Sequence, residues 1–349
     1  MLWQNDRLDK LITMAKFFNK SPLISWVDVS IGVLLIGLVI FLALGVGFGT
    51  WENPLRMDEI AWQIRYPRIL TALLVGLCLS VGGSALQALF QNPLADPSLI
   101  GTSGGAALGV VFALSLGLGE MSFLGLDLAG IGVSLFAFLG AMSVCGLILL
   151  FYRLFGGGQV GLLILGFVMS AFCGALVSLV LFMSDDLTLR SATNWLSGSM
   201  AEAGFVPFSY VLVAIGFGLV ILLPMGRKLD ILMLGEKTAI SMGQDVGKIR
   251  LLTVIGAALL TASAVALAGV IGFIGMMIPN LLAYAWGGSR TRLMIGSGVL
   301  GAVAMLIIDT VARFLTYPVD VPVGIVLALI GSPFFIWIFI KTNQRGNRG

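Results

Sequence analysis

Residues 225–250 read MGRKLDILMLGEKTAISMGQDVGKIR and form the longest charged interruption between two apolar halves of the chain. Eight charged side chains lie in this stretch, and each would cost about 3 kcal/mol or more in hydrocarbon. The segment is therefore expected to lie in water. Its apolar residues, set between glycines at 235, 243 and 247, predict two or three short amphipathic helices. These helices either pack under the protein's own helices or offer a docking surface to a partner outside the bilayer.

The composition is that of a polytopic membrane protein. Of the 349 residues, 58% are hydrophobic and only 11% are charged, far from the average of a soluble domain. The net charge of +3 is small for this length, and we interpret it as a topology signal rather than an attraction to nucleic acid. The sequence contains no histidine, which argues against a carrier of bare metal ions and against a histidine-based pump.

About ten apolar stretches are long enough to cross roughly 30 Å of hydrocarbon, which takes about 20 helical residues. The first is too long for a cleaved signal and is expected to remain as a span. The predicted organisation is an N-terminal segment over residues 1–26, a single polytopic transmembrane domain over 27–340 and a tail over 341–349. The predicted spans are 27–49, 69–90, 98–118, 129–152, 160–183, 206–225, 251–269, 270–286, 294–312 and 323–340.

The apolar run 251–286 is nearly twice the length of one span. We expect it to break near Ala268 and Gly269, because more glycines and Pro279 follow there.

Glycine also recurs every four residues at Gly101, Gly105 and Gly109. This spacing predicts a helix whose backbone approaches a neighbouring helix closely in lipid.

The basic residues predict the orientation in the membrane. With the amino terminus in the cytoplasm, fifteen of the twenty Lys and Arg residues fall in inside segments and five fall outside. The positive-inside rule favours this arrangement. Residues 225–250 and both termini are therefore expected to face the cytoplasm.

The sequence contains no catalytic constellation. No cluster of Cys and carboxylates has metal-ligand spacing, and no nucleophile stands beside a base. Lys237-Thr238 lacks the glycine frame of a phosphate-binding loop. If nucleotide drives this protein, another chain is expected to bind it.

Three groups of residues carry a family resemblance. The first runs from Arg65-Tyr66-Pro67-Arg68 through Gly82-Gly83, Gln87 and Asn92-Pro93-Leu94-Ala95-Asp96-Pro97 to Gly101-Thr102-Ser103-Gly104-Gly105-Ala106. The second joins Leu234-Gly235-Glu236, Ala239 and Met242-Gly243 to Gly272-Phe273-Ile274-Gly275 and Ile278-Pro279-Asn280. The third comprises Asp309, Ala312-Arg313, Pro322-Val323-Gly324 and Gly331-Ser332-Pro333-Phe334-Phe335. From about residue 60 to 340 the chain resembles the FecCD family, the ten-span permease subunits of ATP-driven importers for ferric siderophores, haem and cobalamin.

The resemblance implies an all-α integral membrane protein with the type II ABC importer permease fold, located in the bacterial inner membrane. Its expected partners are an ATP-binding cassette ATPase, a periplasmic substrate-binding protein and a second permease subunit, most simply an identical copy. ATP and Mg²⁺ are expected on the ATPase, and no cofactor or metal is expected on this chain. The implied cargo is a metal chelate, with ferric siderophore as first choice and haem or cobalamin as alternatives.

The resemblance also implies roles for individual residues. Arg65, Arg68 and Arg313 correspond to arginines that engage acidic residues of the binding protein. As alternatives, Arg65 and Arg68 anchor a span at the headgroups, and Asp309 pairs locally with Arg313, four residues further along a helix. The implied coupling residues, which sit in a groove of the ATPase, are Leu234, Gly235, Glu236, Ala239, Met242 and Gly243.

The chain departs from the family pattern at three positions. Asn280 and Ala283 replace the usual histidine and arginine, which is expected to alter the contact with the ATPase. Asp320 stands where glutamate is usual.

The residues that line the translocation path are less specific in sequence. Small and hydroxyl residues alternate with large apolar ones in the fifth span and just after it, and the candidates are Gly166, Ser170, Asn194 and Ser197. Ordinary helix packing explains the same pattern. A rival function is an ion-coupled secondary transporter, for which only Asp309 offers an intramembrane acid.

Overall fold

The computed structural model describes residues 26–46, 53, 59–118, 122–123, 126–127, 132–201, 208–315 and 320–346. Residues 1–25 of the predicted N-terminal segment and the last three residues of the tail lie outside this part of the chain. In the described part, helices are joined by turns, and the strands are the two-residue antiparallel pair β1 (Ser122–Phe123) and β2 (Leu126–Asp127). The helices are α2 (Trp26–Gly45), α3 (Glu59–Leu89), η2 (Pro97–Ile100), α4 (Thr102–Ser115), α5 (Gly132–Phe155), α6 (Gly158–Met183), α7 (Asp186–Leu196), α8 (Phe208–Leu232), α9 (Glu236–Ser241), α10 (Val246–Ala268), α11 (Ile274–Ala285), α12 (Arg290–Leu315) and α13 (Val323–Gly346).

Each predicted span corresponds to a helix, and the all-helical membrane fold is confirmed. In the described residues, six helices are long and apolar enough to cross a membrane, and four shorter apolar helical stretches accompany them. Two of the shorter helices correct the predicted lengths. The helix α4 has 14 residues and α11 has 12, so neither reaches the roughly 20 residues that a full crossing requires.

Backbone conformations explain why these two helices are short. Gly101, with φ 75°, ends η2 and precedes the first turn of α4, so it is a turn residue rather than part of a helix face. The expected break after Ala268 is confirmed, because Gly269 terminates α10 with φ 73°. Phe273, also in the left-handed region with φ 69°, then begins α11.

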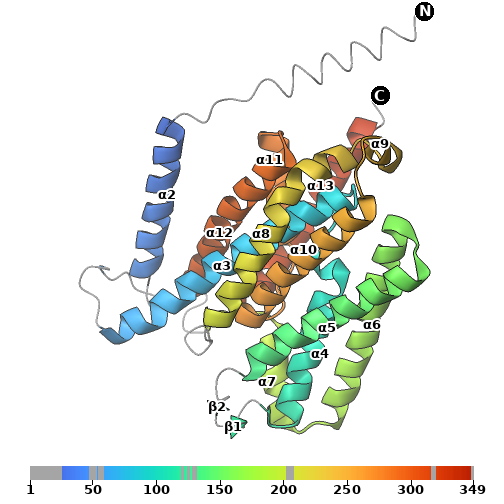
Figure 1. Cartoon of the computed structure of the whole chain (residues 1–349). Coiled ribbons are helices and arrows are strands. Elements are labelled where there is room, and N and C mark those ends of the chain that lie inside the picture. Colours follow the sequence, from blue (N-terminus) through green and yellow to red (C-terminus); the bar gives the residue numbers. More distant parts are fainter. Residues whose placement is uncertain are drawn as a thin grey trace, which may run out of the picture.

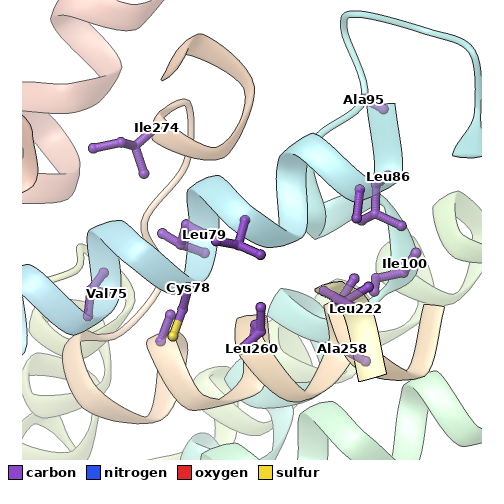
Figure 2. Packing of buried hydrophobic residues seen from close by; sticks show 14 of the residues in the cluster. Val75, Cys78, Leu79, Leu86, Ala95, Ile100, Leu222, Ala258, Leu260 and Ile274 are labelled. Atoms are coloured by element: carbon purple, nitrogen blue, oxygen red, sulfur yellow. The ribbon is translucent and has the colours of Figure 1, made fainter. Parts of the chain in front are cut away.

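The core is centred on α3 and α10, which lie side by side in the middle of the bundle (Figure 1). In α10, 17 of the 23 residues are buried, against a small minority in α6. Figure 2 shows Cys78 and Leu86 of α3 facing Leu260 of α10 and Leu222 of α8. All four side chains are fully buried or nearly so. Most of the other long helices expose large apolar side chains, as expected where lipid replaces water as solvent.

Glycines allow backbones to touch at two crossings. A Cβ on Gly105 of α4 would overlap the carbonyl oxygen of Gly140 on α5, and one on Gly109 would overlap that of Phe136. This confirms the predicted close approach at Gly105 and Gly109. On the other side of the bundle, a Cβ on Gly83 of α3 would overlap the carbonyl oxygen of Gly275 on α11.

The charged stretch 225–250 contains one short helix, not two or three. The helix α8 continues to Leu232, because Leu222, Met225, Leu229 and Leu232 extend a buried stripe at helical spacing past the first charges. After α9, the helix α10 begins at Val246 and contains the last residues of the charged stretch. The short helix α9 lies at one end of the bundle and α7 at the opposite end (Figure 1).

Candidate functional site

The helix α9 presents an apolar surface outside the bundle. It follows Gly235, whose φ of 110° and ψ of 147° belong to a region that is essentially restricted to glycine. Ala239 is the single buried residue among the six of α9, all of which the structure describes. Leu234, Ile240 and Met242, in and beside the helix, expose 57%, 58% and 54% of their surfaces. Ala239 therefore anchors α9 on the bundle while the apolar side chains around it face outward.

An ion pair fixes the first turn of α9. Glu236 Oε2 lies 2.6 Å from Nη2 of Arg250 in the second turn of α10. Nη1 of Arg250 also donates to the hydroxyl of Tyr152, near the end of α5, at 3.3 Å. Sequence reasoning treated Arg250 only as an inside charge. Its position next to a continuous apolar helix was the available signal that it needs a partner.

Side-chain amides brace the helix ends near α9. Gln91 Nε2 donates to the carbonyl of Leu232, the last residue of α8, at 2.9 Å. Gln159 Nε2 donates to the carbonyl of Leu89, the last residue of α3, at 2.7 Å. Carbonyls at helix C-termini have no partner within the helix, so these amides satisfy them and join neighbouring elements. Neither glutamine was identified from the sequence as a site residue.

The first two sequence motifs meet in space. Gln87 Nε2 of α3 donates to the carbonyl of Met276 on α11 at 3.0 Å, near the Gly83 to Gly275 crossing. Asn280 Nδ2 donates to the carbonyl of Pro93 at 2.6 Å and to that of Met276 at 3.0 Å. The asparagine that departs from the family pattern thus faces the turn after α3. Its expected effect on an ATPase contact stays a prediction.

A buried ion cluster lies on α3, α12 and the residues before α13. Arg68 Nη2 lies 2.8 Å from Asp309 Oδ1, and its Nη1 lies 2.7 Å from Asp320 Oδ2. Asp309 is fully buried, and Arg313 Nε lies 3.2 Å from its Oδ2, so the local pair expected four residues apart is confirmed. Burial opposes ionisation of Asp320, but the hydrogen bonds and charge of Arg68 and the charge of Arg313 outweigh it and lower the pKa of Asp320 below its usual value.

The other two arginines of this region reach α2. Arg65 Nη1 donates to the carbonyl of Leu44 at 2.9 Å, and Arg65 is only 6% exposed. Arg313 donates to the carbonyls of Val46 and Ala43 at 3.4 and 3.5 Å. The structure therefore brings Arg68 and Arg313 together on Asp309 and places Arg65 near Arg313. Their role in docking stays a prediction.

The predicted path residues form two groups on two helices. On α6, Gly166 is buried, and a Cβ there would overlap the carbonyl oxygen of Leu99, while Ser170 is half-buried. At the end of α7, Asn194 is exposed and the hydroxyl of Ser197 donates to the carbonyl of Thr193 at 2.8 Å. Close packing accounts for Gly166, and a path role for the four residues stays a prediction.

Comparison with known proteins identifies the family. The model of the FecCD transport family matches residues 33–341, nearly the whole chain. The chain belongs to the FecCD transport family. This FecCD permease is 36% identical to the hemin transport system permease protein HmuU of Yersinia pestis over 331 residues, which cover 90% of this chain and 96% of that protein. It is 34% identical to the vitamin B12 import system permease protein BtuC of Salmonella typhi, over 85% and 88% of the two chains.

A solved structure supports the same family assignment. It is described as an inward-facing conformation of a metal-chelate type ABC transporter, and it matches this FecCD permease with a TM-score of 0.77 and 32% identity. The match covers 89% of this chain and 97% of that one. The protein is therefore a multi-pass membrane permease of the type II ABC importer class.

Proposed function

We propose that this FecCD permease is the membrane subunit of an ATP-driven importer in the bacterial inner membrane. It would receive a metal chelate from a periplasmic binding protein and release it into the cytoplasm. ATP and Mg²⁺ would be bound by a separate ATPase. The observation that carries the proposal is α9, which is anchored by one buried alanine and surrounded by exposed Leu234, Ile240 and Met242.

Such a surface fits a groove on a soluble partner. Apolar side chains that are exposed in water are costly unless a protein covers them, and a short helix that docks by its apolar face is a common recognition mode. With the α9 end in the cytoplasm, as the distribution of basic residues predicts, that partner is the ATPase. The coupling residues would be Leu234, Gly235, Glu236, Ala239, Met242 and Gly243.

The binding protein would dock at the other end of the bundle. The first turns of α3 lie there, opposite α9 (Figure 1). Arg68 and Arg313 pair with Asp309 and Asp320. Arg65 lies close enough to Arg313 to interact with its charge, so the group as a whole has a surplus of one positive charge. An acidic side chain of the binding protein would compete with Asp320, whose side chain is 40% exposed, rather than with the buried Asp309.

Two variants that each remove one charge test this docking. Arg313→Gln is expected to weaken association with the binding protein, and Asp320→Asn to strengthen it, with on-rates that fall as salt increases. Unchanged affinity in both variants would remove the cluster from the docking surface.

The second permease subunit would be an identical copy, with the translocation path between the two. The support is α6, which is largely exposed in the single chain and carries large apolar residues such as Phe167, Phe172 and Phe182. The two-fold dimer is the commonest symmetric homo-oligomer among soluble proteins. Gly166, Ser170, Asn194 and Ser197 remain the proposed path residues.

The cargo class is an intact metal chelate, with ferric siderophore proposed first and haem or cobalamin as alternatives. Support comes from the relatives, whose names refer to hemin, vitamin B12 and metal chelates. The decisive experiment reconstitutes permease, ATPase and binding protein in proteoliposomes and adds each chelate in turn. Uptake should require ATP and should survive collapse of the proton gradient.

Uptake driven by the gradient without ATP would favour a secondary transporter instead. The structure offers little support for that rival. Its one candidate acid, Asp309, is fully buried and already forms ion pairs with both Arg68 and Arg313.

A further inference from the structure

Arg250 lies where three helices meet at the α9 end of the bundle. It belongs to α10, pairs with Glu236 of α9 at 2.6 Å, and donates to Tyr152 of α5 at 3.3 Å. The arginine is 6% exposed, whereas the side chain of Glu236 is 49% exposed. A buried guanidinium is stable only with a counter-charge, so α9 supplies the carboxylate that neutralises a charge inside α10.

Few other contacts hold α9 in place. Ala239 is its one buried side chain, and two glycines with positive φ lie near its ends, Gly235 directly before it and Gly243 one residue beyond Met242. These glycines allow the connections to α8 and α10 to bend. A charge-assisted hydrogen bond is about twice as strong as a neutral one. Movement of α9 would therefore be transmitted more strongly through the Glu236–Arg250 ion pair than through the glycine-containing connections of α9 to α8 and α10.

The helix α10 connects this end of the bundle to the opposite end. It is the most buried of the long helices, with 17 of its 23 residues inside the protein. Beyond its last residue, a Cβ on Gly269 would overlap the carbonyl oxygen of Trp195 at the end of α7. Next to it, the amide of Gly324, in the first turn of α13, donates to the carbonyl of Gly198 at 3.1 Å. The proposed path residues Asn194 and Ser197 lie at this junction.

We propose that Arg250 is a positioning residue for energy coupling: it locks α9 to α10, and through Tyr152 to α5, so that displacement of α9 moves the α7 junction. A tightly packed helix shifts as a unit rather than deforming, which makes α10 suitable for carrying such a movement. This inference rests on the proposed coupling of α9 to an ATPase. It adds Arg250 and Tyr152 to the proposed coupling residues.

The test uses the complete complex of permease, ATPase and binding protein in proteoliposomes. The variants are Arg250→Met, Tyr152→Phe, and the exchanged pair Glu236→Arg with Arg250→Glu. The matched control is Lys248→Met, an exposed residue two positions earlier on α10. Three quantities are measured for each: cargo imported per ATP hydrolysed, affinity of the permease for the ATPase, and unfolding temperature.

Arg250→Met is expected to lower import per ATP by about tenfold, an effect within the coupling energies found for directly paired residues. Tyr152→Phe should lower it about twofold, because the hydrogen bond that is lost is long, at 3.3 Å, and its acceptor is an uncharged hydroxyl. The exchanged pair should recover at least half of the loss, and the control should match the wild type. Recovery by exchange distinguishes coupling from general destabilisation, since the exchanged pair retains the contact without the native residues.

Two results would overturn the inference. One is import per ATP that stays at the wild-type value in Arg250→Met. The other is import per ATP that falls in proportion to the loss of ATPase affinity or of unfolding temperature, and that the exchanged pair does not restore. If the wild-type permease itself neither binds an ATPase nor imports with ATP, the proposed function fails instead.

Discussion

The guanidinium group of Arg68 lies 2.8 Å from the carboxylate of Asp309, although 241 residues separate the two along the chain. The same guanidinium binds Asp320 through two further hydrogen bonds, at 2.7 and 3.0 Å. It therefore joins α3, α12 and the start of α13 at one point. The cluster has a structural role in this chain whether or not a binding protein also uses it.

Removing Arg68 should destabilise the protein. We expect Arg68→Ala to lower the free energy of unfolding by about 3 kcal/mol, the low end of the range for broken buried pairs, because Arg313 still neutralises Asp309. Denaturant unfolding in detergent would measure the change. Arg190→Ala, on the exposed surface of α7, serves as control and should change stability by less than about 0.5 kcal/mol. Equal losses in both variants would contradict a buried network.

The lowered pKa of Asp320 predicts how its ion pair depends on pH. A carboxylate whose pKa falls on folding contributes stability above its unfolded pKa, about 3.9, and loses that contribution as the pH falls through the folded value. The stability difference between wild type and Asp320→Asn should therefore be constant from pH 7 to 5 and shrink below about pH 4. Because Asp320 is partly exposed, the difference should not exceed about 1 kcal/mol. A difference that shrinks already between pH 7 and 5 would show that the pair does not hold this carboxylate ionised.

The crossing of α3 and α11 should tolerate only glycine at position 83. Gly83→Ala places a methyl group on the carbonyl oxygen of Gly275, and the resulting displacement should cost about 1–3 kcal/mol. Gly146→Ala in α5, where a Cβ meets nothing within 4 Å, should be neutral or slightly stabilising. Thermal unfolding of the two variants side by side provides the comparison. Equal unfolding temperatures would show that the helices separate easily.

The conformation of Gly235 should matter for coupling. An alanine there must adopt φ 110° and ψ 147°, which costs about 1–3 kcal/mol, or else shift the start of α9. We expect Gly235→Ala to reduce cargo imported per ATP without loss of the folded permease. Gly247→Ala, where a Cβ makes only an ordinary contact with Asp245, is the control. Unchanged import per ATP in Gly235→Ala would remove this glycine from the coupling segment.

Local sequence was sufficient to predict the helices but not the side-chain contacts that join them. Apolar stretches predicted the positions of the ten helices, and glycine spacing predicted the contacts of Gly105 and Gly109, because both signals act within one helix. The C-terminal end of α8 was missed because exposed charges concealed a buried stripe of apolar residues that continues to Leu232. The short lengths of α4 and α11 depend on positive φ at Gly101 and Phe273, and nothing in composition predicts this for a phenylalanine.

The site followed the same division. The resemblance predicted a coupling segment and three docking arginines, and these roles stay predictions. The four-residue spacing of Asp309 and Arg313 predicted their ion pair, which is confirmed. The pairing of Arg68 with Asp320 and of Arg250 with Glu236 depends on tertiary packing, so one sequence alone does not identify the partner of either arginine.

The length of α4 has a consequence for the surrounding bilayer. Fourteen residues of helix rise about 21 Å, so about 9 Å of the hydrocarbon thickness falls to residues outside it. The preceding turn is built for that depth: Pro97 and Ile100 are buried, and the carbonyl of Leu99 rests on Gly166. Irregular backbone survives at such depth only where acyl chains are kept away. The helices α3, α4, α6 and α10 contact η2. Any rearrangement that separated them from η2 would expose its peptide groups to lipid.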